Sequence, residues 1–327
     1  MEWEYAVIVR ERSRQIGWMI RILKETENYI AVRKPAGMAT QSGKLGQMDL
    51  VNQVLNELAA RQRRERRLQG KTGLPEAPYL AVINRLDQPV EGIVLFAKNP
   101  KAAAKLSEML RNHEIRKEYL AVVCLIEKKG PSGNDIKMTG RIEPDAGNEM
   151  TGRIEPGDGI EMTGRIEPGN EMEMARDMNP EDGKWHELSD FMARDGRGNT
   201  SRIVHEGTPG AQKAILQYRM LKMSGAEQTG MKRALLLVDL DTGRHHQIRL
   251  QLSHAGMPIV GDRKYGIESG RGTDFAEKRR GEHGDFPALC AFRLIFTDPW
   301  SRERVEIRNL PEGKNFASIG EIRMAEI

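Results

Sequence analysis

The sequence predicts an α+β fold with a mixed β-sheet. Apolar runs of strand length outnumber the stretches that show helical periodicity. The helical stretches are interspersed among these runs without the regular strand–helix alternation of a parallel α/β protein. The chain has 327 residues, of which 39% are hydrophobic, and this is enough to build the core of one large domain or two modest ones.

The strands are expected where short apolar or alternating runs are bounded by turn residues. The first such run, residues 29–33, is followed by Lys34-Pro35-Ala36-Gly37, where proline and glycine should end the strand. The other runs are residues 79–83, 92–97, 118–126, 211–221, 234–240, 290–296 and 304–308.

Residues 47–63 should form an amphipathic helix, because apolar residues recur there at helical spacing. A second helix is expected from Pro100 to about Asn112 with Asn99 as its N-cap, since proline suits the first turn and an asparagine side chain can accept from a free backbone amide. A short third helix should end at Gly256. Its apolar face would consist of Ile248, Leu252 and Ala255.

The composition argues against several protein classes. No apolar run approaches the roughly 20 residues that a membrane-spanning helix needs. The first residues lack the basic and apolar regions of a secretory signal peptide, so none is expected. Two cysteines, Cys124 and Cys290, are too few for a disulfide framework or a four-cysteine zinc site, and both are expected to be reduced core residues. A cytoplasmic enzyme fits these features.

Charge is unevenly distributed along the chain. The net charge is +4, but residues 131–184 carry six basic and thirteen acidic residues, so the remainder carries a net charge of +11. A basic body favours a polyanionic partner. The densest basic run, residues 61–67 followed by Lys71, allows two interpretations: a solvated helix end whose arginines face the negative end of the helix dipole, or a contact with nucleic acid.

The acidic segment 131–184 contains an internal repeat. Met-Thr-Gly-Arg-Ile-Glu-Pro occurs at residues 138–144, 150–156 and 162–168, with a period of twelve residues. Repeats of this kind can form a solenoid. The apolar content is too low to bury much surface, and each proline limits helix length, so a mobile acidic insertion is the preferred prediction.

Separate stretches of the chain carry the residues with chemical potential. They are Lys-Pro-Ala-Gly-Met at 34–38, Asn-Arg-Leu-Asp-Gln-Pro-Val-Glu-Gly at 84–92, Lys-Glu-Tyr-Leu-Ala at 117–121, Thr-Gly-Arg-His-His-Gln-Ile-Arg-Leu at 242–250 and Gly-Asp-Arg-Lys-Tyr-Gly at 261–266. Each stretch alone has an ordinary interpretation, such as a surface ion pair, a half-buried tyrosine or a turn.

Together and in this order, the stretches resemble the RluA family of pseudouridine synthases. The resemblance implies a mixed, largely antiparallel sheet with flanking helices and loops and a central catalytic cleft. It assigns residues 29–130 and 185–311 to the catalytic domain, 131–184 to an insertion, 1–28 to an N-terminal segment and 312–327 to a C-terminal tail. The N-terminal segment is too short for the S4 RNA-binding domain that family members often carry.

Two departures from the family pattern affect the second stretch. Asn84 stands where the family usually has histidine, and Val90-Glu91 stands where it usually has Thr-Ser. Both changes leave Asp87 in place but alter the expected hydrogen bonding around it.

The resemblance implies that the protein isomerises specific uridines in structured RNA, ribosomal or transfer, to pseudouridine without a cofactor. In agreement, the chain has no Walker loop and no dinucleotide fingerprint. Asp87 corresponds to the catalytic aspartate and Arg249 to the arginine that pairs with it. Tyr119 corresponds to the tyrosine that stacks on uracil and helps to remove the C5 proton. The residues expected to contact RNA are Arg85, Lys34, Arg244, His246 and Lys264.

Three other interpretations of these residues have to be considered. The adjacent His245 and His246 suggest a metal site, but adjacent side chains normally point to different faces and no third ligand accompanies them, so no metal is expected. A catalytically inactive RNA-binding or ribosome-assembly factor could share the fold. A nucleoside or glycoside hydrolase would need a second carboxylate near Asp87, and the candidates are Glu91 and Asp262, neither with an evident partner. The expected oligomeric state is a monomer.

Overall fold

The computed structural model describes the segments that carry the predicted motifs. The described ranges are 20–43, 46–73, 75–125, 183–196, 198–224, 232–266 and 286–327. The predicted insertion at 131–184 lies outside these ranges except for its last two residues, and most of the predicted N-terminal segment 1–28 also lies outside them. No helix within the described ranges is long and apolar enough to cross a membrane.

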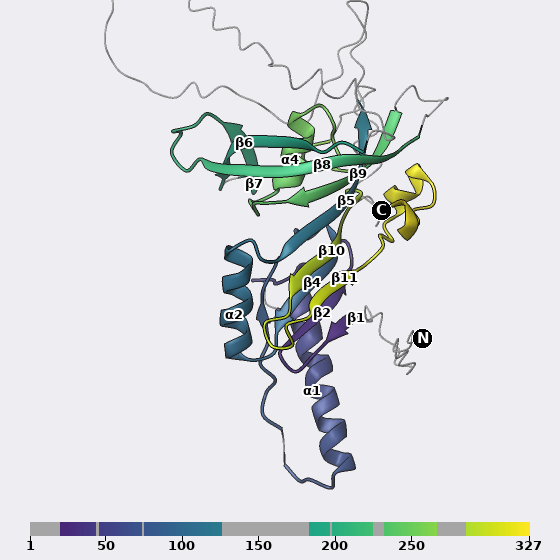
Figure 1. Ribbon diagram of the computed structural model, residues 1–327. Coiled ribbons are helices and arrows are strands. Elements are labelled where there is room, and N and C mark those ends of the chain that lie inside the picture. Colours follow the sequence, from purple (N-terminus) through teal and green to yellow (C-terminus); the bar gives the residue numbers. More distant parts are fainter. Residues whose placement is uncertain are drawn as a thin grey trace, which may run out of the picture.

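Within the described part of the chain, eleven strands form one continuous sheet. The strands are β1 (Arg21–Glu25), β2 (Tyr29–Lys34), β3 (Ala81–Val82), β4 (Glu91–Ala97), β5 (Arg116–Leu125), β6 (His186–Asp195), β7 (Thr200–Val204), β8 (Gln212–Ser224), β9 (Lys232–Leu240), β10 (Leu289–Thr297) and β11 (Arg304–Arg308). Their order is β1-β2-β4-β10-β5-β9-β8-β6-β7, with β3 paired to β4 and β11 to β10 (Figure 1). β10 runs parallel to β4 and the other pairs are antiparallel, so the predicted mixed, largely antiparallel α+β fold is confirmed.

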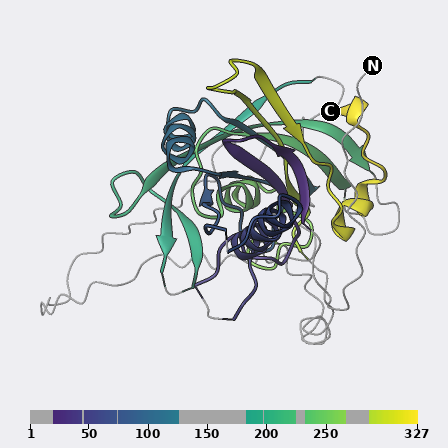
Figure 2. The ribbon, with the colours of Figure 1, turned by 90° about the horizontal axis from the view of Figure 1, so that it is seen from below.

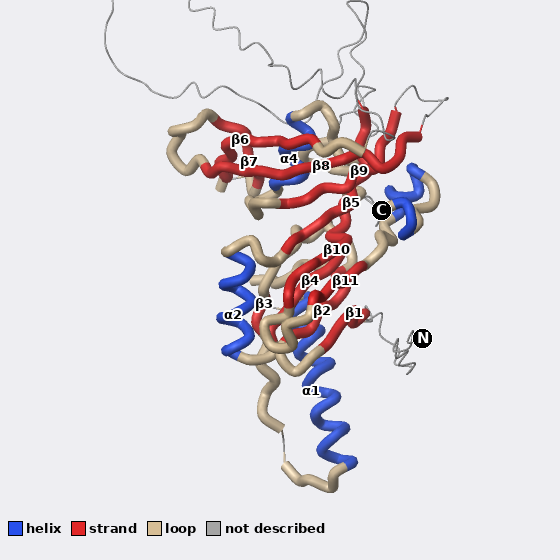
Figure 3. Tube along the Cα trace, viewed as in Figure 1, coloured by secondary structure: helices blue, strands red, loops and turns tan. Residues whose placement is uncertain are grey.

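In the described part of the chain the helices are few compared with the strands (Figure 3). They are α1 (Leu50–Leu68), α2 (Pro100–Arg111), α4 (Gln247–His254) and the 3₁₀ helices η2 (Lys314–Ile319) and η3 (Met324–Glu326). The predicted start and cap of α2 are confirmed, because Asn99 accepts a hydrogen bond from the amide of Ala102 at 2.8 Å. α1 begins three residues later than expected, because Asp49 is its N-cap and accepts from the amide of Asn52 at 2.8 Å.

The sheet has a hydrophobic core on each face. Side chains alternate along β2, so Ile30 and Val32 join one core while Tyr29 and Ala31 join the other. α1 packs its buried leucine and valine side chains on the first face, and α2 packs on the second. Both helices run along the long axis of the molecule and are seen end-on in Figure 2. β4 is covered on both faces, and all seven of its residues are therefore buried.

Several elements were absent from the sequence prediction. β1 pairs with β2 at the edge of the sheet, so the folded part begins before residue 29. β6 and β7 were missed because their polar side chains hide the alternation of a half-buried strand. The segment 312–327, predicted as a tail, contains η2, which buries Phe316 and Ile319 in the first core.

The glycine at position 92 permits the one parallel contact of the sheet. Gly92 has φ +125°, a conformation that side-chain-bearing residues rarely adopt, and a Cβ atom there would overlap the backbone of Ala291 in β10. β4 can therefore lie directly beside β10, and the loop that carries Asp87 enters the sheet at this point.

Candidate active site

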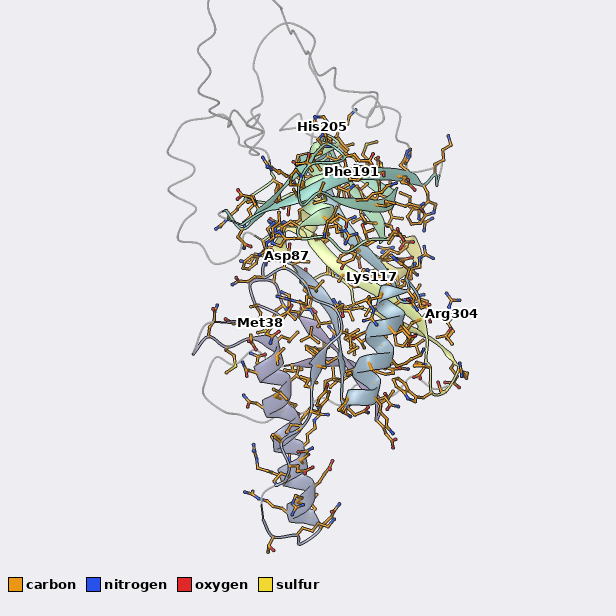
Figure 4. All side chains as sticks on the ribbon, turned by 90° about the vertical axis from the view of Figure 1, so that its left-hand side faces the viewer. Met38, Asp87, Lys117, Phe191, His205 and Arg304 are labelled. Atoms are coloured by element: carbon orange, nitrogen blue, oxygen red, sulfur yellow. The ribbon has the colours of Figure 1, made fainter. Side chains whose placement is uncertain are left out.

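A cleft of about 310 Å³ lies where the loop before β4, the start of β5 and the loop before α4 meet. Figure 4 shows Asp87 and Lys117 at mid-height of the molecule, between the part that contains β6–β9 and the part that contains α1 and α2. The lining residues include Asp87, Tyr119, Arg249, Arg85, Arg244 and His246, together with Asn84, Lys117, Gln247 and Ile248. Six of the eight predicted site residues thus surround one cavity of a size typical for small-ligand pockets.

Arg249 connects two aspartates at the base of this cleft. Its Nη1 donates to Asp87 Oδ2 at 3.2 Å, so the predicted Asp87–Arg249 pair is present. Its other donors, Nε and Nη2, bind the two carboxylate oxygens of Asp262 at 2.7 and 2.8 Å. The Asp262 carboxylate is fully buried, whereas that of Asp87 is 27% exposed and accessible from the cleft. The stronger partner of Arg249, Asp262, was not assigned from the sequence.

The ionised states of this pair follow from their contacts. Burial alone would lower the pKa of Arg249, but its hydrogen bonds to Asp262 and its proximity to both carboxylates outweigh burial and raise that pKa. Burial would likewise raise the pKa of Asp262, yet Arg249 and the backbone amides of Lys264 and Tyr265 lower it. Arg249 therefore stays a cation with one donor directed at Asp87.

The loop that carries Asp87 is held by the turn after β2. Lys34 is fully buried and donates to the carbonyl oxygens of Pro35 at 3.0 Å, Met38 at 2.6 Å and Gln88 at 3.0 Å. The prediction that Lys34 contacts RNA is therefore wrong, because all three ammonium donors point at backbone carbonyls inside the protein. Thr40 adds a second link, since its hydroxyl both donates to the carbonyl and accepts from the amide of Leu86.

Tyr119 forms one wall of the cleft beside Asp87. It lies on β5, opposite Ala291 of β10 and Val238 of β9, and only 7% of its surface is exposed. Burial raises the pKa of its phenol strongly, and the nearby Asp87 charge adds to the effect. Tyr119 is consequently a neutral phenol at neutral pH.

The two adjacent histidines do not point to different faces, contrary to the expectation from regular helix or strand geometry. His246 has φ 57°, and this left-handed conformation stacks its ring on that of His245, with ring centroids 3.7 Å apart. His246 Nδ1 lies 2.8 Å from the Tyr265 hydroxyl and its Nε2 lies 3.6 Å from Asp87 Oδ2. Burial lowers the pKa of His246 to about 4, so the ring is neutral at neutral pH. The tautomer with the proton on Nε2 lets Nδ1 accept a hydrogen bond from the Tyr265 hydroxyl.

β7 anchors this histidine pair through contacts that the sequence did not reveal. The Ser201 hydroxyl lies 2.9 Å from His245 Nδ1 and donates to the His245 carbonyl at 2.8 Å. The Ser201 amide donates to the Tyr265 hydroxyl at 2.8 Å, and the Tyr265 ring lies beneath the Arg249 guanidinium at 5.3 Å. In the sequence, only the tyrosine of the Gly-Asp-x-x-Tyr-Gly stretch could have indicated these contacts.

The other residues predicted to contact RNA do not all lie at the cleft. Arg85 and Arg244 are exposed at the cleft, where Arg244 also donates to the Lys213 carbonyl at 3.0 Å. Lys264 does not line the cavity and donates to the Asn199 carbonyl at 2.6 Å. Within the described ranges, no group of three or more His, Cys, Asp or Glu side chains is placed to hold a metal ion.

Both departures from the family pattern have structural roles. Asn84 donates from its side-chain amide to the Ile93 carbonyl at 3.1 Å and accepts from the Leu95 amide at 2.7 Å, so it ties the motif loop to β4. Glu91 accepts from the Gly313 amide at 2.7 Å and pairs with Arg33 at 3.0 Å, which fixes the C-terminal segment to the sheet. Glu91 and Asp262 therefore both have partners, contrary to expectation, and neither is available as a second catalytic carboxylate.

Comparison with known proteins finds similarity to RNA pseudouridine synthases. The sequence profile of the RNA pseudouridylate synthase family matches residues 28–254. Ribosomal large subunit pseudouridine synthase D of Xylella fastidiosa is 26% identical over 247 residues, which are 75% of this chain and 51% of that protein. tRNA pseudouridine synthase C of Haemophilus ducreyi is 24% identical over 298 residues, with 88% of this chain and 90% of that protein covered.

Solved structures share the fold. Human RNA pseudouridylate synthase domain containing 4 aligns with a TM-score of 0.51 and 20% identity over 89% of this chain and 88% of that one. Human RNA pseudouridylate synthase domain containing 1 aligns with a TM-score of 0.51 and 18% identity, covering 91% and 86% of the respective chains. The chain spans about half the length of the ribosomal relative from Xylella fastidiosa.

Proposed function

Because this chain belongs to the RNA pseudouridylate synthase family, we propose that it isomerises specific uridines in structured RNA to pseudouridine. The single observation that carries the proposal is the hydrogen bond of 3.2 Å between Arg249 and the accessible carboxylate of Asp87, beside the ring of Tyr119 in one cleft. Ribosomal and transfer RNA are the substrate classes named for the relatives, and we propose RNA of this kind as the partner.

The proposed reaction is balanced without a cofactor. The N1–C1′ bond of uridine breaks, the uracil turns within the cleft, and C5 bonds to C1′. The proton that leaves C5 is replaced by one gained at N1. No electron is transferred to or from another molecule, so the protein has to supply a carboxylate, a wall for the base and a route for one proton.

Asp87 is the group that acts on the ribose. An ionised carboxylate can attack C1′, stabilise positive charge there, or remove a ribose proton. The Arg249 guanidinium fixes the direction of the carboxylate by a charge-assisted hydrogen bond. His246 contributes a neutral ring whose Nε2 lies 3.6 Å from Oδ2 of Asp87.

Tyr119 provides a flat surface for the released uracil. Its neutral ring can stack on the base while the base turns. A neutral phenol is a weak base, so we propose that stacking is its main contribution and that the C5 proton leaves through the hydroxyl only if the phenol proton passes onward to an acceptor.

The exposed arginines at the cleft suit an extruded nucleotide. A uridine in a stem must leave the base stack to reach Asp87. Arg85 precedes Asp87 by two residues and lines the cleft from its exposed side, where a guanidinium can occupy the vacated position or bind a phosphate. Arg244 lines the cavity from the loop before α4 and can bind a second phosphate.

Tritium release from RNA that contains 5-tritiated uridine tests this proposal. Transcripts of large-subunit ribosomal RNA and of transfer RNAs would be incubated with the protein, and release of tritium without loss of uracil is expected. RNA binding without release would instead favour an inactive binding or assembly factor. Release of free uracil would favour a hydrolase.

A further inference from the structure

α1 extends beyond the core that stabilises its first half. Leu50, Val54 and Leu58 are buried, but the same side of the helix then carries Arg61 and Glu65. Leu68, at the end of the helix, is 83% exposed. Figure 1 shows this half of α1 extending past the sheet. A helical segment that buries so little apolar surface gains little stability from packing, so its length calls for another explanation.

The outward side of α1 carries amides and then arginines. Asn52, Asn56, Arg63 and Arg67 are exposed and follow one another at helical spacing, and the exposed Arg64 lies beside them. We call these five residues the α1 arm. Glu57 and Glu65 lie outside the stripe that Asn52, Asn56, Arg63 and Arg67 form.

Two arginines of the α1 arm, Arg63 and Arg67, are available to a partner. In the part of the chain that the structure describes, the side chains of Arg63 and Arg67 form no hydrogen bond or ion pair, whereas the neighbouring Arg61 is paired with Glu57 and Glu25. Arg63 and Arg67 are four residues apart, and like charges at this spacing destabilise a free helix. A bound polyanion would relieve that repulsion.

The α1 arm is connected to the Asp87 loop. The amide of Leu50, at the start of α1, donates to the Ala39 carbonyl at 3.0 Å. Thr40, which follows Ala39, donates a hydrogen bond from its hydroxyl to the carbonyl of Leu86 in the Asp87 loop. Figure 4 shows Met38, Asp87 and α1 on the same side of the molecule, with Arg304 on the other side. At a rise of 1.5 Å per residue, Arg63 lies about 20 Å and Arg67 about 25 Å along the axis from Leu50.

We propose that the α1 arm is a second RNA-contact surface, which binds phosphates of the RNA that flanks the target uridine. This proposal rests on the proposed function, because it assumes RNA in the Asp87 cleft. Arginine and amide side chains commonly contact phosphate and sugar without reading sequence. RNA is favoured over an anionic membrane because the side of α1 opposite the arm carries Arg61 and Glu65 where an interfacial helix needs apolar residues.

The test compares paired variants on two RNA probes. Arg63→Gln/Arg67→Gln removes two charges from the arm, Arg63→Lys/Arg67→Lys keeps them, and Arg302→Gln/Arg304→Gln removes two exposed charges near Arg304 on the other side of the molecule. One probe is an RNA hairpin with a stem of about 16 base pairs, which is long enough to cover a domain-sized surface. The second probe has the same loop on a stem of about half that length.

The Arg63→Gln/Arg67→Gln variant, called the Gln arm variant below, should bind the long hairpin at least about tenfold more weakly than wild type at 0.1 M salt. The slope of its log Kd against log salt concentration should be smaller than that of wild type by about one to two. The Lys variant and the Arg302→Gln/Arg304→Gln control should match wild type, and on the short hairpin the Gln arm variant should also match wild type. Thermal unfolding would verify that all variants are folded.

Three results would overturn the proposal: equal affinity of wild type and the Gln arm variant for the long hairpin, an equal loss on both hairpins, or an equal loss in the control variant. Binding to vesicles that contain phosphatidylserine is measured for the same variants. If vesicle binding depends on Arg63 and Arg67 but RNA affinity does not, the surface is assigned to a membrane. These experiments measure RNA binding and not turnover. An absence of tritium release would therefore contradict the proposed function but would not change the measured RNA affinities.

Discussion

Asp262 accepts two hydrogen bonds from Arg249, at 2.7 Å from Nε and 2.8 Å from Nη2, and this arrangement leaves Nη1 directed at Asp87. The guanidinium fork is rigid and planar, so binding two of its donors fixes the direction of the third. The orientation of the group that meets the carboxylate in the cleft is thus set by a buried residue that does not itself line the cleft.

Replacing Asp262 should therefore affect both stability and turnover. Asp262→Asn removes the charge that pairs with buried Arg249, and loss of one partner of a buried ion pair costs about 3 kcal/mol or more in the free energy of unfolding. Isomerisation should fall on the order of a hundredfold, because small misplacements of a positioned group are costly. Urea unfolding and tritium release measure the two effects. The exposed Asp241→Asn variant is the matched control, and an Asp262→Asn enzyme with normal turnover would show that this pair is only structural.

Replacing Asp87 should stop the reaction and spare binding. Asp87→Asn keeps the shape of the side chain but removes the negative charge that we propose acts on the ribose, so tritium release should fall on the order of 10³-fold or more. RNA affinity should stay within a fewfold of wild type, since phosphate contacts elsewhere supply most of it. Near-normal turnover in this variant would contradict the assignment of Asp87.

Lys34 should make stability depend on pH. Burial lowers its pKa from 10.5 to about 7, so above pH 7 the folded protein releases a proton that the unfolded chain retains. The free energy of unfolding should therefore rise with pH from about 7 to 9, by up to about 1.4 kcal/mol per pH unit from this group. Lys34→Met should remove that rise, whereas the exposed Lys101→Met should keep it. Parallel pH curves for wild type and Lys34→Met would refute the argument.

Asn84 should matter for folding more than for chemistry. Its amide bonds both a carbonyl and an amide of β4, so Asn84→Ala should cost about 2 kcal/mol in the free energy of unfolding. Asn84→His restores the residue usual in the family, and a neutral imidazole has one donor and one acceptor, so its cost should be smaller. Denaturant unfolding of the two variants tests this order, and a larger loss in Asn84→His would contradict it.

Local sequence signals predicted much of the fold. The start of α2 was predictable because a capping asparagine and a first-turn proline stand next to each other at positions 99 and 100. β11 was predicted with its observed ends, Arg304 and Arg308, because its buried and exposed side chains alternate. β6 and β7 were not predicted, because their polar side chains hide the strand alternation and because α4, which contacts both strands, comes from a distant part of the chain.

The site shows where local reasoning fails. Asp87, Tyr119 and Arg249 were predicted to meet, and all three line one cleft. The role of Lys34 was predicted wrongly because a sequence shows a charge but not the three carbonyl groups that converge on it. The stacking of the two histidines could not be predicted, because it depends on the left-handed backbone at His246.

The position of β10 between β4 and β5 has a consequence for synthesis on the ribosome. β4 and β5 are complete by Leu125, but the strand that joins them begins at Leu289. A nascent chain must therefore keep two unpaired strand edges from misassociating until more than 160 further residues have been added. Translation stalled in this interval would yield an aggregation-prone fragment in which Asp87 and Tyr119 are already made but are not yet held together by the strand between them.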